Sequence, residues 1–229
     1  MKTSLLFVVA LACATSTHAV GVTPPDAPKP PCCREGSPPG KYRETSIYKL
    51  GSIWTSDVGR DVKLEVLRGH PQVLALFFTN CQHSCPLIVA DMKTIEKALS
   101  RGLRSKVDFL LVSIDPKRDT LEALREYRAK YQLGIEHWTL LRGSAEAVKQ
   151  LADRVGFQYS PGSERQFGHS LVITILDGNG EIVFQQAGVG NLPNGAVSTL
   201  LRITRKDAKG APQYPFWSGT SEPTLRPKM

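Results

Sequence analysis

Continuous apolar runs alternate along this chain with segments whose apolar residues recur every three to four positions. The runs at 73–79 and 107–114 are mostly apolar, which is typical of strands buried on both faces of a sheet. Between them, the segment 86–100 places its apolar residues on one helical face. These residues are Ile88, Met92, Ile95 and Leu99. Such an alternation predicts parallel strands that are joined and covered by helices.

Helix boundaries follow from capping residues. Gly102 is expected to end the first helix, because glycine tolerates the backbone conformation found beyond a helix C-terminus. Asp119, with Glu122 three residues later, resembles a capping box and predicts a helix that runs to about residue 132 and closes near Gly134.

The second half of the folded region continues the pattern and ends differently. A strand at 138–141 and a helix from Ser144 to just before Gly156 come first. Two strands at 171–176 and 181–186 then flank the turn sequence 177–180, "DGNG", which joins antiparallel neighbours. A helix at about 196–203 follows. This order predicts an α/β, thioredoxin-like fold: a central sheet flanked by helices, with an inserted strand and helix and a C-terminal β-hairpin plus helix.

Cys81 and Cys85 stand where the first strand passes into the first helix. Pro86 suits the first helical turn, where its missing N–H would have no partner. Free N–H groups and the helix dipole favour the thiolate there, and thiolates are redox nucleophiles and soft ligands of copper(I) and zinc. A spacing of four residues brings the Cα atoms to about 6 Å, which a disulfide can bridge but does not require. A structural disulfide, a redox couple and a metal site all remain open.

A histidine occupies a position that matters in this fold. Thioredoxins have a cis-proline before the third central strand, facing the cysteines, whereas this chain has His169 within "FGHS". Two thiolates and one imidazole suit copper in either oxidation state. His83, between the cysteines, is an alternative ligand that we expect to face solvent. His70 and His137 are interpreted as structural.

The N-terminus predicts export. Residues 1–19 combine Lys2, a short apolar stretch and small residues, as in a secretory signal peptide, with cleavage expected after Ala19. The apolar stretch is roughly half of the about 20 residues that span a bilayer. We expect a soluble protein of the bacterial periplasm, or alternatively a protein lipid-anchored at Cys13. Reactive thiols in an oxidising compartment need a thiol reductant as a partner.

The remaining segments are Pro-rich. We interpret residues 20–40 as a linker, 41–205 as the folded domain and 206–229 as a tail. Cys32 and Cys33 in the linker either collect copper and exchange disulfides with the main pair, or are exposed thiols. The net charge of +8 comes without an arginine-rich tract, which argues against nucleic acid and leaves peripheral contact with acidic protein or membrane surfaces.

Three motifs resemble the Sco (SenC) family of copper-binding proteins that serve in assembly of the binuclear copper centre of cytochrome c oxidase. They are "FFTNCQHSCP", "LVSIDPKRDT" and "GHSLVITILDGNGEIV", in family order. The resemblance implies copper ligation by Cys81, Cys85 and His169, with residues 115–116 and 118–120 in a loop beside the site. It also implies transfer to a copper-acceptor protein such as an oxidase subunit.

The chain departs from that family in three places. Gly168 stands where members often have an acidic residue, which removes one support for the metal. A membrane-spanning N-terminal helix, common in the family, is not expected, and "PCCREG" lies outside the pattern.

Other functions stay open, so whether the chain is an enzyme is undecided. A thiol-disulfide reductase acting on partner cysteines would need Cys81 and Cys85 but not the histidine. A peroxiredoxin-like peroxidase would use Cys81 as the peroxide-reacting thiol. A structural zinc site would need a fourth ligand, such as His83.

Overall fold

A computed structural model of the chain describes residues 42–160 and 168–210, with only the backbone for 206–210. The predicted signal peptide, the linker with Cys32 and Cys33, and nearly all of the predicted tail lie outside these residues. None of the described helices combines the length and the apolar character that a membrane crossing requires.

The centre of the molecule is a seven-stranded mixed sheet with the order β2-β1-β5-β4-β3-β8-β9. Its strands are β1 (Ile53–Ser56), β2 (Asp61–Lys63), β3 (Gln72–Phe77), β4 (Asp108–Ser113), β5 (Trp138–Gly143), β8 (Val172–Leu176) and β9 (Ile182–Ala187). β3, β4 and β5 are parallel, whereas β8 runs antiparallel to both β3 and β9. A separate pair, β6 (Tyr159–Ser160) and β7 (Gly168–His169), is antiparallel.

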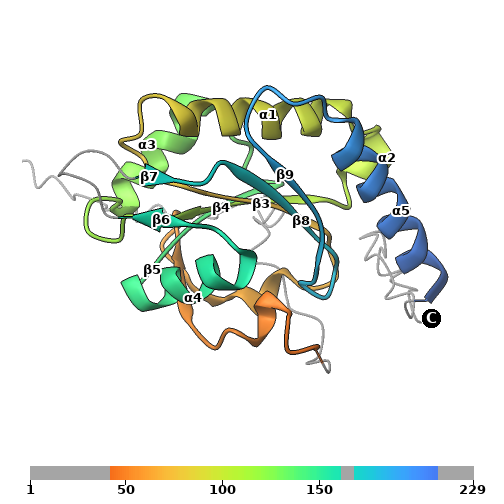
Figure 1. Ribbon diagram of the computed structural model, residues 1–229, viewed down its shortest axis with the longest axis horizontal. Coiled ribbons are helices and arrows are strands. Elements are labelled where there is room, and N and C mark those ends of the chain that lie inside the picture. Colours follow the sequence, from red (N-terminus) through yellow and green to blue (C-terminus); the bar gives the residue numbers. More distant parts are fainter. Residues whose placement is uncertain (1–41, 161–167, 211–229) are drawn as a thin grey trace, which may run out of the picture.

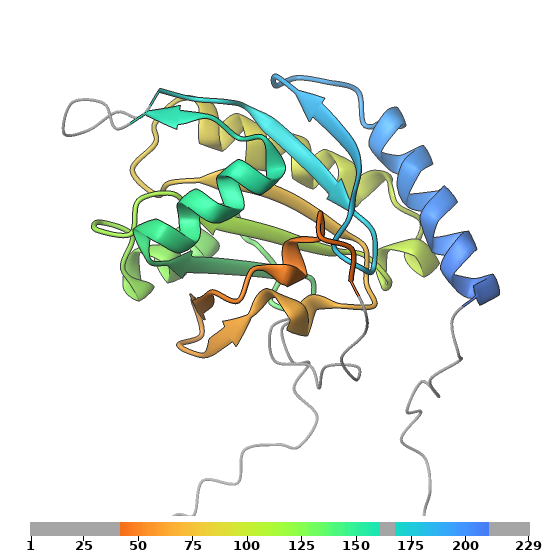
Figure 2. The same ribbon diagram turned by 60° about the horizontal axis from the view of Figure 1, so that its bottom comes forward.

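Helices cover both faces of this sheet. They are α1 (Ser84–Ala98), α2 (Arg101–Arg104), α3 (Leu121–Tyr131), α4 (Ala145–Val155) and α5 (Asn194–Gly210), with the 3-10 turns η2 (Ile47–Lys49) and η3 (Leu64–Leu67). Figure 1 shows α1 and α3 on one face and α4 on the other, and Figure 2 shows α4 and the N-terminal turns together. α5 packs beside α1 and against β8 and β9.

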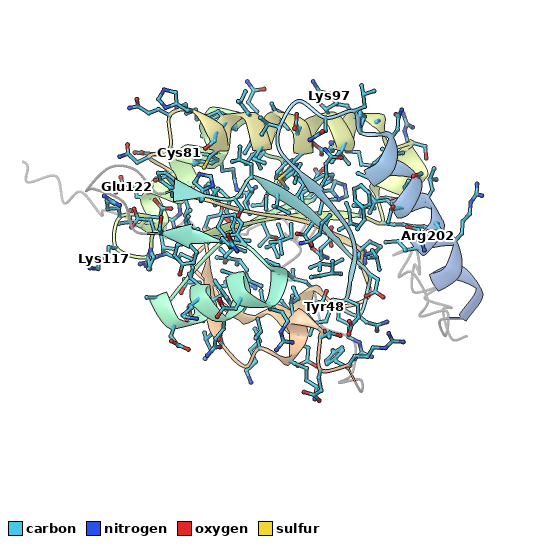
Figure 3. All side chains as sticks on the ribbon, viewed as in Figure 1. Tyr48, Cys81, Lys97, Lys117, Glu122 and Arg202 are labelled. Atoms are coloured by element: carbon cyan, nitrogen blue, oxygen red, sulfur yellow. The ribbon has the colours of Figure 1, made fainter. Side chains whose placement is uncertain are left out.

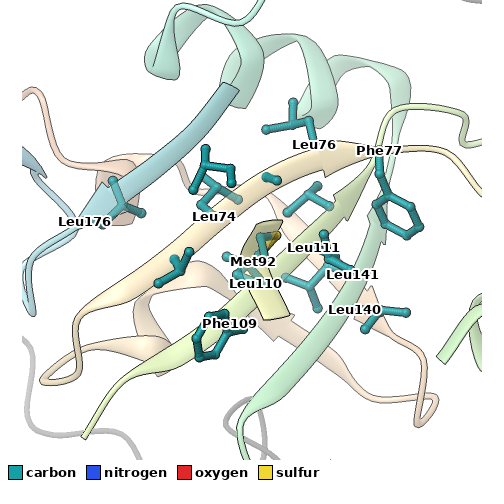
Figure 4. Packing of buried hydrophobic residues seen from close by; sticks show 14 of the residues in the cluster. Leu74, Leu76, Phe77, Met92, Phe109, Leu110, Leu111, Leu140, Leu141 and Leu176 are labelled. Atoms are coloured by element: carbon teal, nitrogen blue, oxygen red, sulfur yellow. The ribbon is translucent and has the colours of Figure 1, made fainter. Parts of the chain in front are cut away.

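Burial explains why the central strands are apolar without alternation. Every residue of β3 and β4 is buried, because helices cover both faces. Phe109 of β4 stacks on Trp138 of β5, with ring centroids 4.7 Å apart. Side chains fill the space between sheet and helices (Figure 3), and Figure 4 shows Leu74, Leu110 and Met92 meeting in this core. Because β3 and α1 both pack into this core, the loop between them has a defined position.

The predicted thioredoxin-like fold is confirmed. β3, α1 and β4 form the first parallel unit, β8, β9 and α5 form the C-terminal hairpin and helix, and β5 with α4 is the insertion. The sequence did not predict β1, β2, β6 or β7. These strands have two to four residues each, too few to display a period-two pattern.

Two predicted helix boundaries were wrong, and one was confirmed. Thr120, rather than Asp119, is the N-cap of α3, and its hydroxyl accepts a hydrogen bond from the Ala123 N–H. The predicted end near residue 132 is correct, but Gln132, in the left-handed conformation at φ 51°, closes the helix rather than Gly134. Gly102 lies inside the short helix α2, because α1 already ends at Ala98.

Other predicted boundaries are confirmed. Ser144 caps α4 by accepting from the Ala147 N–H, and Gly156 ends it at φ 66°, a conformation that favours glycine. The turn between β8 and β9 closes at Gly180, whose φ of 75° also favours glycine. α5, predicted at about 196–203, is longer at both ends.

Candidate metal centre

The carboxyl ends of β3 and β4 form the edge at which the candidate residues gather. Cys81 follows β3 in the loop that leads into α1, and Cys85 is the second residue of that helix. Figure 3 shows Cys81 beside the start of α1, at the end of the molecule where β7 lies. β7 supplies His169 and pairs with β6, so His169 reaches this edge from a distant part of the chain. Ligand sites in α/β sheets commonly form outside these strand ends.

Cys81, Cys85 and His169 converge as predicted from the sequence. One ligand atom from each lies within 4.8 Å of the others, and Cys85 Sγ is 4.0 Å from His169 Nε2. In the described part of the chain, no other group of three histidine, cysteine or acidic side chains is this close. Both thiols are free rather than joined in a disulfide. The three atoms together can hold one metal ion.

The backbone fixes which nitrogen of His169 faces the sulfurs. His169 Nδ1 lies 2.9 Å from the carbonyl oxygen of Ser170, and a carbonyl can only accept, so Nδ1 carries the hydrogen. In the neutral ring, Nε2 then presents its lone pair. The rings of Phe78 and Phe157 flank the imidazole, with centroids 5.7 Å and 6.0 Å away. This orientation matches that of histidines that bind metals through Nε2.

Cys81 is half-buried and acidic. Burial by itself raises its pKa, but hydrogen bonds from the Ser84 hydroxyl and from the N–H groups of Cys85 and His83 outweigh it and lower the pKa to about 6. The Cys85 N–H lies 3.3 Å from Cys81 Sγ. The sequence predicted this effect from the helix N-terminus. Cys81 is therefore largely a thiolate at neutral pH.

Cys85 differs from Cys81 in both burial and acidity. Its side chain is only 1% exposed. Burial raises the pKa of the Cys85 thiol, and the neighbouring Cys81 raises it further, although a backbone hydrogen bond from Phe78 opposes both. The expectation of two acidic thiols was thus wrong for Cys85, because desolvation exceeds the effect of the helix start.

A pocket of about 340 Å³ opens beside Cys81. It is lined by Thr79, Asn80, Cys81, Gln82, Pro86, Lys130 and Tyr131. Its walls come from the loop after β3, the start of α1 and the end of α3. An incoming group can therefore reach Cys81 from this side.

Asp119 supports the cysteine loop from beneath. Its buried carboxylate accepts hydrogen bonds from the N–H of Thr79 at 3.2 Å, from the Thr79 hydroxyl at 2.6 Å and from Ser113. Burial raises the pKa of Asp119, and these hydrogen bonds offset only part of that rise. Asp115 pairs with Arg118.

The other histidines lie apart from this group. His83 is exposed, and its side chain caps no helix. His70 Nδ1 and His137 Nδ1 lie 3.6 Å and 3.8 Å from the two carboxylate oxygens of Asp108, at the opposite end of β4. Sequence reasoning found no acidic partner for either, because Asp108 is distant in the chain.

Sequence reasoning also missed Ser84. Its Oγ lies 3.1 Å from His169 Nε2 and 3.4 Å from Cys81 Sγ. The only signal was its place in the motif, directly before Cys85 at the expected start of the helix.

Comparisons with known proteins agree with this geometry. The SCO1 protein homolog of Bacillus subtilis is 28% identical over 138 residues, covering 59% of this chain and 71% of that protein. Further relatives from Stutzerimonas, Rickettsia, human and yeast are aligned over only 36–63% of their own length.

Two solved structures share the fold. Bradyrhizobium japonicum ScoI, solved with copper bound, matches with a TM-score of 0.55 and 21% identity, covering 66% of this chain and 96% of that one. BsSco, described as having a disulfide switch and as a member of the Sco family of cytochrome c oxidase assembly proteins, matches with a TM-score of 0.60 and 24% identity, covering 67% and 91%. At these identities the likeness shows the fold alone.

The family model for SCO1/SenC matches residues 52–194, which include both cysteines, His169 and the whole central sheet. The resemblance inferred from three short motifs is confirmed over more than half of the chain, and the chain belongs to the SCO1/SenC family.

Proposed function

We propose that this protein is an exported copper chaperone that holds copper through Cys81, Cys85 and His169 and passes it to an acceptor protein. The observation that carries the proposal is the convergence of two sulfurs and one imidazole nitrogen within 4.8 Å at an accessible edge of the sheet. Copper is the cargo of this reaction rather than a permanent part of the protein.

The donor set favours copper over zinc. Two thiolates are soft ligands that suit copper(I), and the imidazole also suits copper(II). A structural zinc ion needs four protein ligands, and the group described here supplies three. His83, considered as the fourth, does not belong to the group.

Relatives support the choice of metal and of acceptor. ScoI carries copper, and BsSco belongs to a family of cytochrome c oxidase assembly proteins. We therefore propose a cytochrome c oxidase subunit as the copper acceptor. Residues 1–19, outside the described part, remain the basis for proposing the periplasm as the site of this transfer.

Release of copper would begin at Cys81. An acceptor thiolate or imidazole that enters the neighbouring pocket can bind the metal as the Cys81 sulfur leaves it, so no electron moves. Cys85 and His169 keep the ion in place until further acceptor ligands replace them. The buried position of Cys85 makes it the last sulfur that an acceptor can reach.

An anaerobic copper(I) titration of the reduced full-length protein tests this function. The background carries serine at Cys13, Cys32 and Cys33, so that sulfurs outside the described region do not bind the metal. We expect one copper per chain, and a loss of affinity of about 1,000-fold or more in Cys81→Ser and Cys85→Ser, since each removes a soft ligand. His169→Ala should lose less.

His83→Ala is the matched control, because it removes a histidine from the same loop but outside the group. It should bind copper like the parent. Unchanged binding in either cysteine variant would show that the metal site is elsewhere.

A specific observation favours a second function, thiol-disulfide reductase. Cys81 is acidic and half-exposed whereas Cys85 is buried and protonated, the asymmetry expected of an attacking and a resolving thiol. The Cys81 thiolate would attack a partner disulfide and release one partner thiolate. Cys85, deprotonated as it reacts, would then displace the second and leave a Cys81–Cys85 disulfide, which an external thiol reductant must reduce.

The His169→Ala variant separates the two functions. If it loses tight copper binding but still reduces a partner disulfide and supports oxidase assembly, reduction is the main activity. If the variant reduces disulfides normally but fails to support oxidase assembly, copper transfer is the main activity.

A further inference from the structure

Ser84 lies between two of the three proposed ligands. It is the first residue of α1, and its hydroxyl oxygen contacts His169 Nε2 at 3.1 Å and Cys81 Sγ at 3.4 Å. It thereby links the start of the helix to β7. Cys85, the next residue of α1, is the other described helix residue with a contact to His169, 4.0 Å from Nε2.

Helix capping does not explain this serine. His83 occupies the N-cap position of α1, and the side chain that accepts from a first-turn N–H is Cys81, not Ser84. Alanine is the better helix former at the position that Ser84 occupies. Within the described residues, the hydroxyl contacts of Ser84 are those with Cys81 and His169.

The hydroxyl has one hydrogen and two acceptors. His169 Nδ1 donates to the Ser170 carbonyl, which leaves a lone pair on Nε2 that accepts from Ser84. The Cys81 sulfur accepts from the same hydroxyl when the hydroxyl rotates. Metal binding would remove one of these acceptors, because the metal takes the Nε2 lone pair.

We propose that Ser84 is a positioning residue that shares its hydrogen bond between His169 Nε2 and the Cys81 sulfur in the metal-free protein, which holds Nε2 toward the sulfurs, and donates to the Cys81 sulfur alone when copper binds. This inference rests on the proposed function. It concerns Ser84, which lies within the motif "FFTNCQHSCP" but to which the resemblance assigns no role.

Two consequences distinguish this role from simple packing. In the metal-free protein the hydroxyl keeps His169 near the sulfurs, so copper binding costs less side-chain conformational entropy. In the loaded protein the hydroxyl bonds to a metal-bound sulfur and withdraws electron density from it. Ser84 therefore acts on both ligands in the metal-free protein and on Cys81 alone in the loaded one.

The test compares Ser84→Ala and Ser84→Thr with the parent, in the background that lacks Cys13, Cys32 and Cys33. In the metal-free, reduced protein, nitrogen NMR of the imidazole should show His169 Nε2 moving toward the position of an unbonded ring nitrogen in Ser84→Ala. Copper(I) affinity should fall about 10-fold in the same variant, as for other groups that support metal ligands. After oxidation, the thiolate-to-copper(II) absorption band should shift to lower energy.

Ser84→Thr keeps the hydroxyl and should restore all three measurements. Ser144→Ala is the matched control, since it also removes a serine hydroxyl at a helix start, and it should leave all three at parental values. The proposal is wrong if Ser84→Ala leaves the Nε2 resonance in place, or if Ser84→Thr loses as much affinity as Ser84→Ala. The NMR measurement needs no copper, so a parent that fails to bind copper overturns the proposed function and not the hydrogen bond.

Discussion

The two ends of the central parallel strands use histidine in opposite ways. At the amino end, the carboxylate of Asp108 lies between His70 and His137, 3.6 Å and 3.8 Å from their Nδ1 atoms. At the carboxyl end, the buried Asp119 accepts hydrogen bonds from uncharged donors of Thr79 and Ser113.

This difference supports placing the proposed metal site at the carboxyl end. No ion pair found among the described residues joins His169 to a carboxylate. Its Nε2 contacts the Ser84 hydroxyl and the Cys85 sulfur, so its lone pair is not committed to a carboxylate. His70 and His137, by contrast, lie with Nδ1 beside a carboxylate, and a ring nitrogen that carries a hydrogen toward a carboxylate cannot bind a metal through that nitrogen.

The largest expected effect is a difference in reactivity between the two thiols at the carboxyl end. At neutral pH, iodoacetamide should modify Cys81 at least about 100-fold faster than Cys85, because only Cys81 is both accessible and largely ionised. Peptide mapping by mass spectrometry of the reduced protein, in the background lacking the other cysteines, measures both rates.

Denatured protein supplies the control for that measurement, since both cysteines should then react at similar rates. Folded-state rates within tenfold of each other would mean that the two thiols are equally open, and that Cys85 is not the protected member of the pair.

The next effect compares the two buried aspartates directly. Asp119→Asn should lower the free energy of unfolding by about 2 kcal/mol, because a fully buried carboxylate loses hydrogen bonds that hold the cysteine loop. Asp108→Asn should cost about 1 kcal/mol or less, since its histidine partners are 37% and 19% exposed. Chemical denaturation of the full-length reduced proteins measures both.

Asp153→Asn is the matched control, because Asp153 forms an exposed pair with Lys149 on α4 and should change stability by less than about 0.5 kcal/mol. If Asp108→Asn costs more than Asp119→Asn, the amino end is the one whose charge the fold depends on, and the comparison is reversed.

The carboxyl end was also easier to predict from sequence, for a physical reason. The apolar runs of β3 and β4 and the junction holding Cys81 and Cys85 are local patterns, and the structure reproduces them. The predicted start of α4 at Ser144 and its end at Gly156 were correct for the same reason, since helix capping depends on neighbours in the chain.

What sequence reasoning missed depends on contacts between distant residues. Asp119 bonds to Thr79, 40 residues earlier, so its carboxylate supports a loop rather than starting α3. Ser84 meets His169 across 85 residues. The hairpin of β1 and β2 is too short for alternation, and Ile53 within it is 60% exposed, which conceals the strand from hydrophobic patterning.

The smallest expected effect is a pH dependence of stability that originates at the carboxyl end. The pKa of Cys81 is about 6 in the folded protein against an ordinary value of 9.0, so between these values the unfolded chain binds more protons. The free energy of unfolding should therefore rise with pH across that window. Cys85 has the opposite sign: its raised pKa makes stability fall as the pH rises above 9.0.

Denaturation of the reduced protein under anaerobic conditions across this pH range measures both slopes. Because Cys81 is only half-buried, solvent screening keeps its slope small, well below what the pKa difference alone would give. Cys81→Ser should flatten the rise and leave the fall at high pH, whereas Cys85→Ser should do the reverse. Ser144→Ala should lower the whole curve by about 1 kcal/mol without changing its shape. A rise that persists unchanged in Cys81→Ser would show that groups other than Cys81 cause it.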